Sequence, residues 1–137
     1  MASIKQSEYE ALAAFRYSLR QFLRFSEDAA RELGLMPHQH QALLAIKGFP
    51  LRQRITVGEL AQRLQIRHNS AVELVNRLVA DKLVTREKSK MDHRQVYVTL
   101  TERGSNLLEQ LSTVHKQELQ RIGPQLNQLL EILSNNE

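Results

Sequence analysis

The sequence contains no cysteine and no tryptophan. Without cysteine the chain cannot form a disulfide, a thiolate metal site or a thiol-based redox sensor. No apolar run approaches the ~18 residues that would cross a membrane. The N-terminal residues lack the apolar core of a signal peptide. We therefore expect a cytoplasmic protein with no membrane partner.

Motifs of catalysis are also missing. The sequence has no glycine-rich phosphate loop, no nucleophile motif and no HExxH zinc motif. This excludes the common enzyme classes, and we predict neither an enzyme nor a bound cofactor. His38 and His40 would face different sides of a helix, which makes them a poor chelating pair. We predict no metal site and keep a metal-sensing module, with His115 as a third ligand, as an alternative.

The positive charge is concentrated in one part of the chain. The net charge is +4, but residues 47–94 hold 11 Lys/Arg and 5 Asp/Glu, a net +6. A local basic excess is the electrostatic footprint expected of a protein that binds phosphates. The other interpretation is an ordinary solvated surface.

Apolar periodicity predicts helices at both ends of the chain. Residues 5–33 carry an apolar residue at every third or fourth position, and so do residues 101–136. A break is expected at Gly123-Pro124, which would leave two helices after residue 101. The part of the chain between these helices is too small to cover all their apolar stripes, so we expect the terminal helices to form a homodimer interface. A monomeric helical bundle is the alternative.

Between these helices, residues 37–100 predict a winged helix-turn-helix. A helix opened by Pro37 is followed by a short basic connection over 51–55. Thr56 and Glu59 then have capping-box spacing before a short helix. Residues 65–67 form the turn into a second helix, which begins between Arg67 and Ser70 and buries Val72 with its other valines and leucines.

Strands are predicted at 83–88 and 95–100, joined by a polar basic hairpin tip. Thr101 is expected to N-cap the helix that follows. The fold class is therefore mainly α (α+β), with a single domain over 1–137. Double-stranded DNA is the expected partner of this module, and a winged-helix module that docks only proteins is the alternative.

Major-groove readers contact base edges with the first turns of the second helix, and phosphates attract the surrounding basic side chains. Arg94 at the hairpin tip can enter a narrow minor groove, and Asp92 can pair with Arg94 or cap its turn. Arg77 has a second option, an ion pair with Asp81 four residues on. The residues predicted to form the DNA-binding surface are Arg63, Arg67, His68, Asn69, Ser70, Asn76, Arg77, Lys88, Lys90, Asp92, His93 and Arg94.

Glu73 does not fit this surface easily. A carboxylate near phosphates is repelled unless it accepts a hydrogen bond from a cytosine amino group. The spacing of Ser70 and Glu73 is also that of a capping box, and we favour this capping role.

The motif Asp92-x-Arg94-x-Val96-x-Val98-x-Leu100-Thr101-x-x-Gly104 resembles the wing of the MarR family of bacterial transcriptional regulators. The segments Leu60-Ala61-x-x-Leu64-x-Ile66, Leu74-Val75-x-Arg77-Leu78 and Leu83-Val84 are similar to its helix-turn-helix. The resemblance implies a homodimeric regulator, expected to be a ligand-responsive repressor on a pseudo-palindromic operator. It also implies that the helix from about Ser70 to Lys82 enters the major groove and Arg94 the minor groove.

Three features depart from the family pattern. Glu73 stands where members often have arginine or a small polar residue, and Lys82 replaces the usual glycine before the first wing strand. The cysteine of the redox-sensing branch is absent. The family often binds a small aromatic effector near its first two helices. This places the candidate effector contacts at Tyr17, Phe22, Phe25, His38 and His40.

Overall fold

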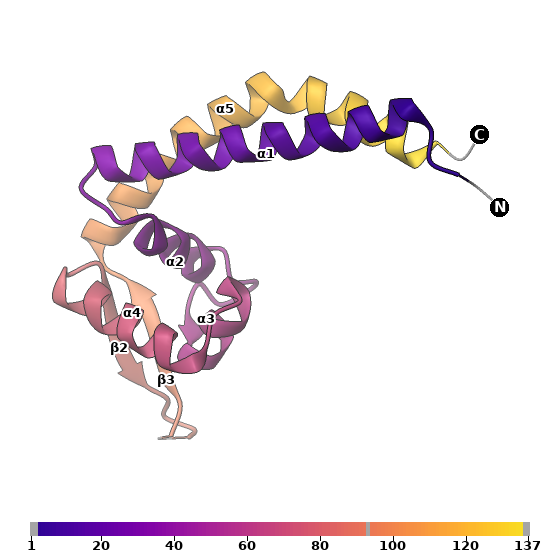
Figure 1. The fold of residues 1–137 in the computed structure, drawn as a ribbon. Helices are drawn as coiled ribbons and strands as arrows, with labels where there is room; N and C mark the ends of the chain where they lie inside the picture. The colour runs from indigo at the N-terminus through magenta and orange to yellow at the C-terminus, as the bar shows by residue number, and fades with distance from the viewer. Residues whose placement is uncertain (1–2, 93, 136–137) are drawn as a thin grey trace. The chain divides into compact units, whose positions relative to one another are not determined.

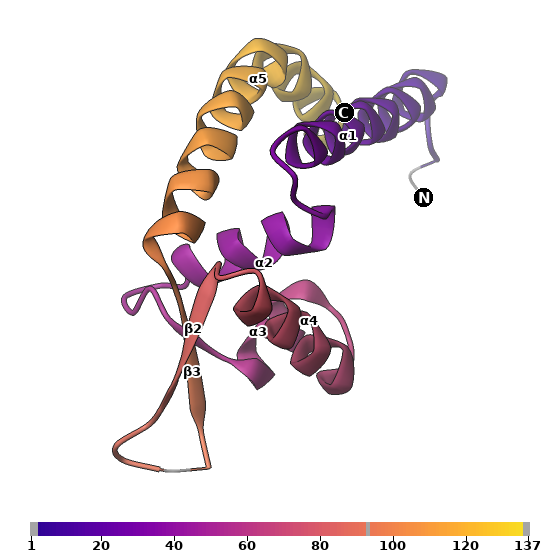
Figure 2. The same cartoon turned by 90° about the vertical axis from the view of Figure 1, so that its left-hand side faces the viewer.

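The computed structural model describes residues 3–92 and 94–135. The chain forms two compact units. One, here called the winged-helix lobe, holds residues 30–111; the other, the helical unit, combines the described parts of 1–29 and 112–137. Figures 1 and 2 show the elements of both units.

The helical unit is built from α1 (Gln6–Glu32) and most of α5 (Glu102–Ser134). Helix α1 confirms the helix expected over 5–33. The break expected at Gly123-Pro124 is wrong, because α5 continues through it with Pro124 inside the helix. Proline removes one backbone donor and strains the helix by about 3 kcal/mol. The apolar stripe, partly buried at Ile122 and Leu126 on either side of this point, favours a single helix over a break.

Aromatic contacts join the two helices of this unit. The His115 ring meets Phe22 and Phe25 edge-on, with ring centroids 5.8 and 5.5 Å apart. Its Nε2 lies 2.7 Å from the Ser26 hydroxyl. His115 of α5 thus contacts three residues of α1.

The winged-helix lobe contains three short helices and a small sheet. The helices are α2 (Pro37–Lys47), α3 (Val57–Leu64) and α4 (His68–Ala80). The strands are β1 (Ile55–Thr56), β2 (Val84–Lys88) and β3 (Val96–Leu100), antiparallel in the order β1-β3-β2. β2 and β3 confirm the predicted strands within one residue. β1 was missed, because two residues carry no alternation signal and their pairing with Val98 and Tyr97 is non-local.

Almost all of the buried apolar side chains described belong to this lobe. Its core is made by one side of each helix and by the inner face of the sheet, including Leu43, Leu60, Leu78 and Val98. In the helical unit only Ala11 is a buried hydrophobic residue among those described. The lobe therefore has its own core, whereas the helical unit leaves much apolar surface exposed.

The segments that flank the wing meet at a tight junction. Lys82 has φ +60°, a left-handed conformation that glycine adopts at less cost. The Thr101 hydroxyl donates to the Lys82 carbonyl at 2.7 Å and accepts from the Gly104 amide at 3.1 Å, confirming the predicted N-cap. A Cβ on Gly104 would lie 2.2 Å from the Leu83 carbonyl oxygen, so only glycine fits.

Candidate nucleic-acid interface

Helix α3 begins with the predicted capping box. The Thr56 hydroxyl accepts from the Glu59 amide at 3.1 Å, and the Glu59 carboxylate accepts from the Thr56 amide at 3.0 Å. Arg52 donates to the other Glu59 oxygen at 2.5 Å. Burial raises the pKa of Glu59, but the hydrogen bonds from Thr56 and Arg52 together outweigh it and hold that pKa below its usual 4.5. The N-terminus of α3 is therefore capped by side chains of the lobe itself.

A left-handed residue makes the turn between α3 and α4. Gln65 has φ +56°, and the Ile66 amide then donates back to the Ala61 carbonyl at 3.0 Å. Ile66, predicted to fill the gap between the two helices, is partly buried. The turn fixes where the next helix starts.

Helix α4 starts at His68, with Arg67 as its N-cap and no side-chain cap. The Ala71 amide already donates to the Arg67 carbonyl at 3.0 Å. Ser70 therefore lies in the first turn, and its predicted capping box with Glu73 is wrong. Because of the turn at Gln65 and Ile66, α4 begins three residues earlier than the spacing of Ser70 and Glu73 predicted.

The burial of α4 separates a core side from a solvent side. Ala71, Val75 and Leu78 are buried. Val72 is 37% exposed, so its predicted place in the buried stripe is wrong. The helix starting at His68 turns Ala71 inward and Val72 outward. The predicted contact residues of α4 are all exposed: His68, Asn69, Ser70, Asn76 and Arg77.

Asp81 does not form the ion pair with Arg77 that the sequence allowed. Its carboxylate accepts a hydrogen bond from the Gln39 side chain of α2 at 2.6 Å. Across residues 3–92 and 94–135, no ion pair joins Arg77 to Asp81. The guanidinium group of Arg77 therefore remains exposed on α4.

The wing tip is ordered by its own hydrogen bonds. The buried Ser89 hydroxyl accepts from the amides of Met91 and Asp92 at 3.2 and 3.3 Å. Asp92 Oδ1 accepts from the Arg94 amide at 3.0 Å and from its Nε at 3.3 Å. Asp92 thus both caps the turn and pairs with Arg94, while the Arg94 side chain stays 92% exposed. His93, also a predicted contact, lies outside the described residues.

The remaining basic residues fall into separate groups. Arg67 is exposed at the turn before α4. Lys88 and Lys90 line a hollow of about 260 Å³ beside Tyr97 on the wing. Arg63, in the last turn of α3, stacks on the Phe49 ring at 5.0 Å. The structure thus distributes the predicted basic residues over α3, the turn and the wing.

A cluster of arginines on aromatic rings was not predicted from the sequence. Arg52 lies over the rings of Phe49 and Tyr97, at 4.5 and 5.6 Å, and Arg54 lies 4.1 Å over Tyr97. Such cation–π contacts hold guanidinium groups in place. The basic connection over 51–55 was the only signal in the sequence, because Tyr97 comes from a distant strand.

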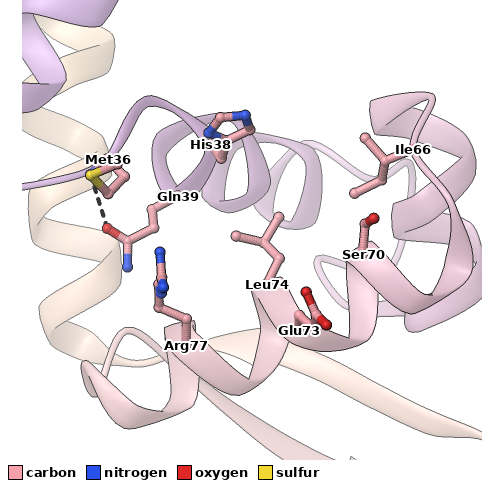
Figure 3. Close-up of a pocket in the computed structure, with 8 residues that line it drawn as sticks. All are labelled: Met36, His38, Gln39, Ile66, Ser70, Glu73, Leu74 and Arg77. Atoms are coloured by element: carbon pink, nitrogen blue, oxygen red, sulfur yellow. Dashed lines mark hydrogen bonds between the residues drawn. The ribbon is translucent and has the colours of Figure 1, made fainter.

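A hollow of about 360 Å³ lies between the start of α2 and α4 (Figure 3). Its apolar walls are Met36, Ile66 and Leu74. Figure 3 shows Ser70, Glu73 and Arg77 along the α4 side and His38 and Gln39 on the α2 side. The Gln39 side chain accepts from the Met36 amide at 3.0 Å and is thereby fixed.

The five candidate effector contacts are divided between the two units: His38 and His40 belong to the winged-helix lobe, and Tyr17, Phe22 and Phe25 to the helical unit. His38 is exposed at the hollow beside α4, and His40 is buried. Phe22 and Phe25 line a different hollow, of about 310 Å³, in the helical unit. Tyr17 is 61% exposed and lines neither. In the described part of the chain, no three His, Asp or Glu side chains form a metal-holding group. None of the helices described has the length and apolar character of a membrane span.

Residues 33–95 match the model described as MarR family. None of the curated proteins compared matches the chain in sequence. Solved structures share its fold, including AbsC, a MarR family transcriptional regulator from Streptomyces coelicolor. AbsC is 19% identical, with a TM-score of 0.75, and the alignment covers 96% of this chain and 90% of AbsC.

A second relative was solved with DNA. It is a mutant of MepR from S. aureus bound to an oligodeoxyribonucleotide, 21% identical with a TM-score of 0.69. The alignment covers 89% of this chain and 94% of that one. MepR itself is described as a transcription regulator of the Staphylococcus aureus multidrug efflux pump MepA. These likenesses establish the winged-helix fold.

Proposed function

We propose that the chain, whose residues 33–95 match the MarR family model, is a transcriptional regulator that binds double-stranded DNA. Helix α4 enters the major groove of a pseudo-palindromic operator, and Arg94 enters the adjacent minor groove. The chain acts as a homodimer and as a ligand-responsive repressor. The observation that carries DNA binding is the pairing, in one lobe, of an exposed recognition helix with an exposed, pre-ordered arginine on the wing.

The start of α4 supports this assignment. The first-turn amides of a helix have no partner within the helix, and here no side chain caps them. Arg67, His68 and Asn69 surround them with exposed polar or basic side chains. Free amides and a basic neighbour at a helix start suit a DNA phosphate.

The wing assignment is tested by Arg94→Ala in a gel-shift or fluorescence-anisotropy assay on duplexes from the chain's own promoter region. We expect about tenfold weaker binding, because one charged groove contact is lost. Wild-type affinity should also fall steeply as salt rises. Arg16→Ala in the helical unit removes the same charge from another exposed site and serves as the control. Equal losses in both variants, or binding insensitive to salt, would refute the wing assignment.

Dimerisation through the helical unit is supported by its surface. Large apolar side chains on α1 and α5, including Tyr9, Leu12, Leu23, Leu119 and Leu130, are exposed in the single chain. Helices with uncovered apolar stripes pack on a second copy. Light scattering at micromolar concentration should give twice the chain's 15.8 kDa. A single 15.8 kDa species would contradict the dimer.

Ligand response is supported by the hollow between α2 and α4. Its walls include Ser70 and Arg77, which are also predicted DNA contacts, so a small molecule bound there would compete with the operator. A thermal-shift series with benzoate, a small aromatic acid, should raise the melting temperature of the chain. Leu74→Trp, which fills the hollow, should abolish the shift. An equal shift in this variant would place the ligand elsewhere.

A further inference from the structure

We infer that Glu73 reads a cytosine in the operator by accepting a hydrogen bond from the cytosine N4 amino group in the major groove. The inference rests on the proposed DNA-binding function and names one base that the recognition helix selects. It assigns a role to the residue of α4 that fits a phosphate-facing surface least.

Glu73 lies on α4 opposite its buried residues. Ala71, Val75 and Leu78 mark the core side of the helix. At about 100° per residue, Glu73 lies roughly 165° around the helix from their mean direction. Asn69 and Asn76, both exposed, lie within roughly 60° of it. Glu73 therefore lies on the solvent side of α4, opposite the core and at the edge of the hollow beside α2, with both asparagines on one side of it.

Glu73 does not have the capping role predicted for it. Because α4 begins at His68, Glu73 lies in the second turn, beyond reach of an N-cap. In the described part of the chain, its carboxylate has neither an ion pair nor a hydrogen bond, although Arg77 follows one turn later. No internal structural role therefore accounts for this carboxylate.

The charge of Glu73 determines which base it can contact in the major groove. An unpaired carboxylate in a major groove is repelled by the phosphates and by the acceptor atoms of guanine and thymine. Cytosine presents an amino donor there, and glutamate accepts from it. Adenine also has an amino group, but its adjacent N7 acceptor opposes a carboxylate and suits an amide instead. Glu73 therefore favours a C·G pair, with repulsion as a penalty at other pairs.

The experiment selects binding sites from a random-sequence duplex library in parallel with the wild-type chain, Glu73→Gln and Glu73→Ala. Glu10→Gln, at an exposed site in α1, is the control with the same change of charge. We expect wild-type sites to contain one position per half-site where cytosine is preferred about tenfold or more. Glu73→Gln should move that preference towards adenine, Glu73→Ala should flatten it, and the other positions should keep theirs. Thermal melting checks that all variants fold.

The outcomes separate this inference from the proposed function. If wild type and Glu10→Gln select a common site and the two Glu73 variants select the same one with unchanged preferences, Glu73 does not read a base. A uniform gain in affinity of the Glu73 variants for every sequence would also overturn the inference, because it shows repulsion alone. If the wild type binds no duplex at low salt, the proposed function fails and the inference fails with it.

Discussion

Helices α3 and α4 are neighbours in one helix-turn-helix, yet they begin differently. In α3, Thr56 and Glu59 satisfy each other's amides, and Arg52 holds the same carboxylate. In α4, the N-cap is Arg67 and no side chain caps the first turn. The capped N-terminus of α3 stabilises the lobe. The N-terminus of α4 has no side-chain cap, which leaves its first-turn amides and side chains available to a partner. Residues of α3 should therefore matter for stability, and exposed residues of α4 for binding.

The largest difference is expected between Leu60→Ala in α3 and Val72→Ala in α4. Leu60 is fully buried and Val72 is 37% exposed. The first change should lower the free energy of unfolding by about 2–5 kcal/mol through a cavity, and the second should change it by less than about 0.5 kcal/mol. Urea unfolding followed by circular dichroism, at one fixed protein concentration, measures both. A comparable loss in Val72→Ala would show that α4 is buried more deeply than the lobe indicates.

A smaller effect separates the two capping-box spacings. Thr56→Ala removes a real cap and should cost about 0.5–2 kcal/mol of stability. Ser70→Ala lies within the first turn of α4, so its stability should stay within about 0.5 kcal/mol of wild type. The same unfolding experiment compares them, and amide exchange at Glu59 reports on the α3 cap directly. Equal losses would mean that Ser70 does cap α4.

The smallest effect is the pH dependence that Glu59 contributes. Its pKa is lowered in the folded state, so its charged form stabilises the lobe above the usual 4.5. That stabilisation is lost as the pH falls through the lowered folded-state pKa. The wild type should therefore lose stability more steeply than Glu59→Gln as the pH falls below about 4.5. Unfolding curves between pH 6 and 3 test this, and Glu102→Gln is the control. If the stability of the wild type and of Glu59→Gln falls equally with pH, Glu59 does not contribute to the pH dependence.

Local signals in the sequence were sufficient where a structure depends on neighbouring residues. The Thr56 cap, the start of α2 at Pro37 and the alternation of β3 were all readable. The wing motif further indicated that Asp92 orders Arg94. These features depend on side chains within a few positions of each other, and most of the fold and of the wing could be predicted from them.

Features set by distant residues could not be predicted in the same way. The spacing of Ser70 and Glu73 is as good a capping box as that of Thr56 and Glu59, but the turn at Gln65 starts α4 before it. Strand β1 exists only through its pairing with β3, and the arginine cluster depends on Tyr97 from that strand. Helix α5 likewise continues through Pro124, although the local sequence predicted a break there.

The hydrogen bonds inside the wing tip have a consequence for ionic strength. Ser89 and Asp92 hold the tip in shape before any partner arrives, which reduces the loss of conformational freedom on binding. Asp92 also carries a negative charge towards the phosphates. Salt screens that repulsion and the exposed ion pair with the Arg94 guanidinium, but it has less effect on the hydrogen bond from the Arg94 amide that caps the turn. Asp92→Ala should therefore weaken DNA binding more at high salt than at low salt, opposite to the loss of a basic contact.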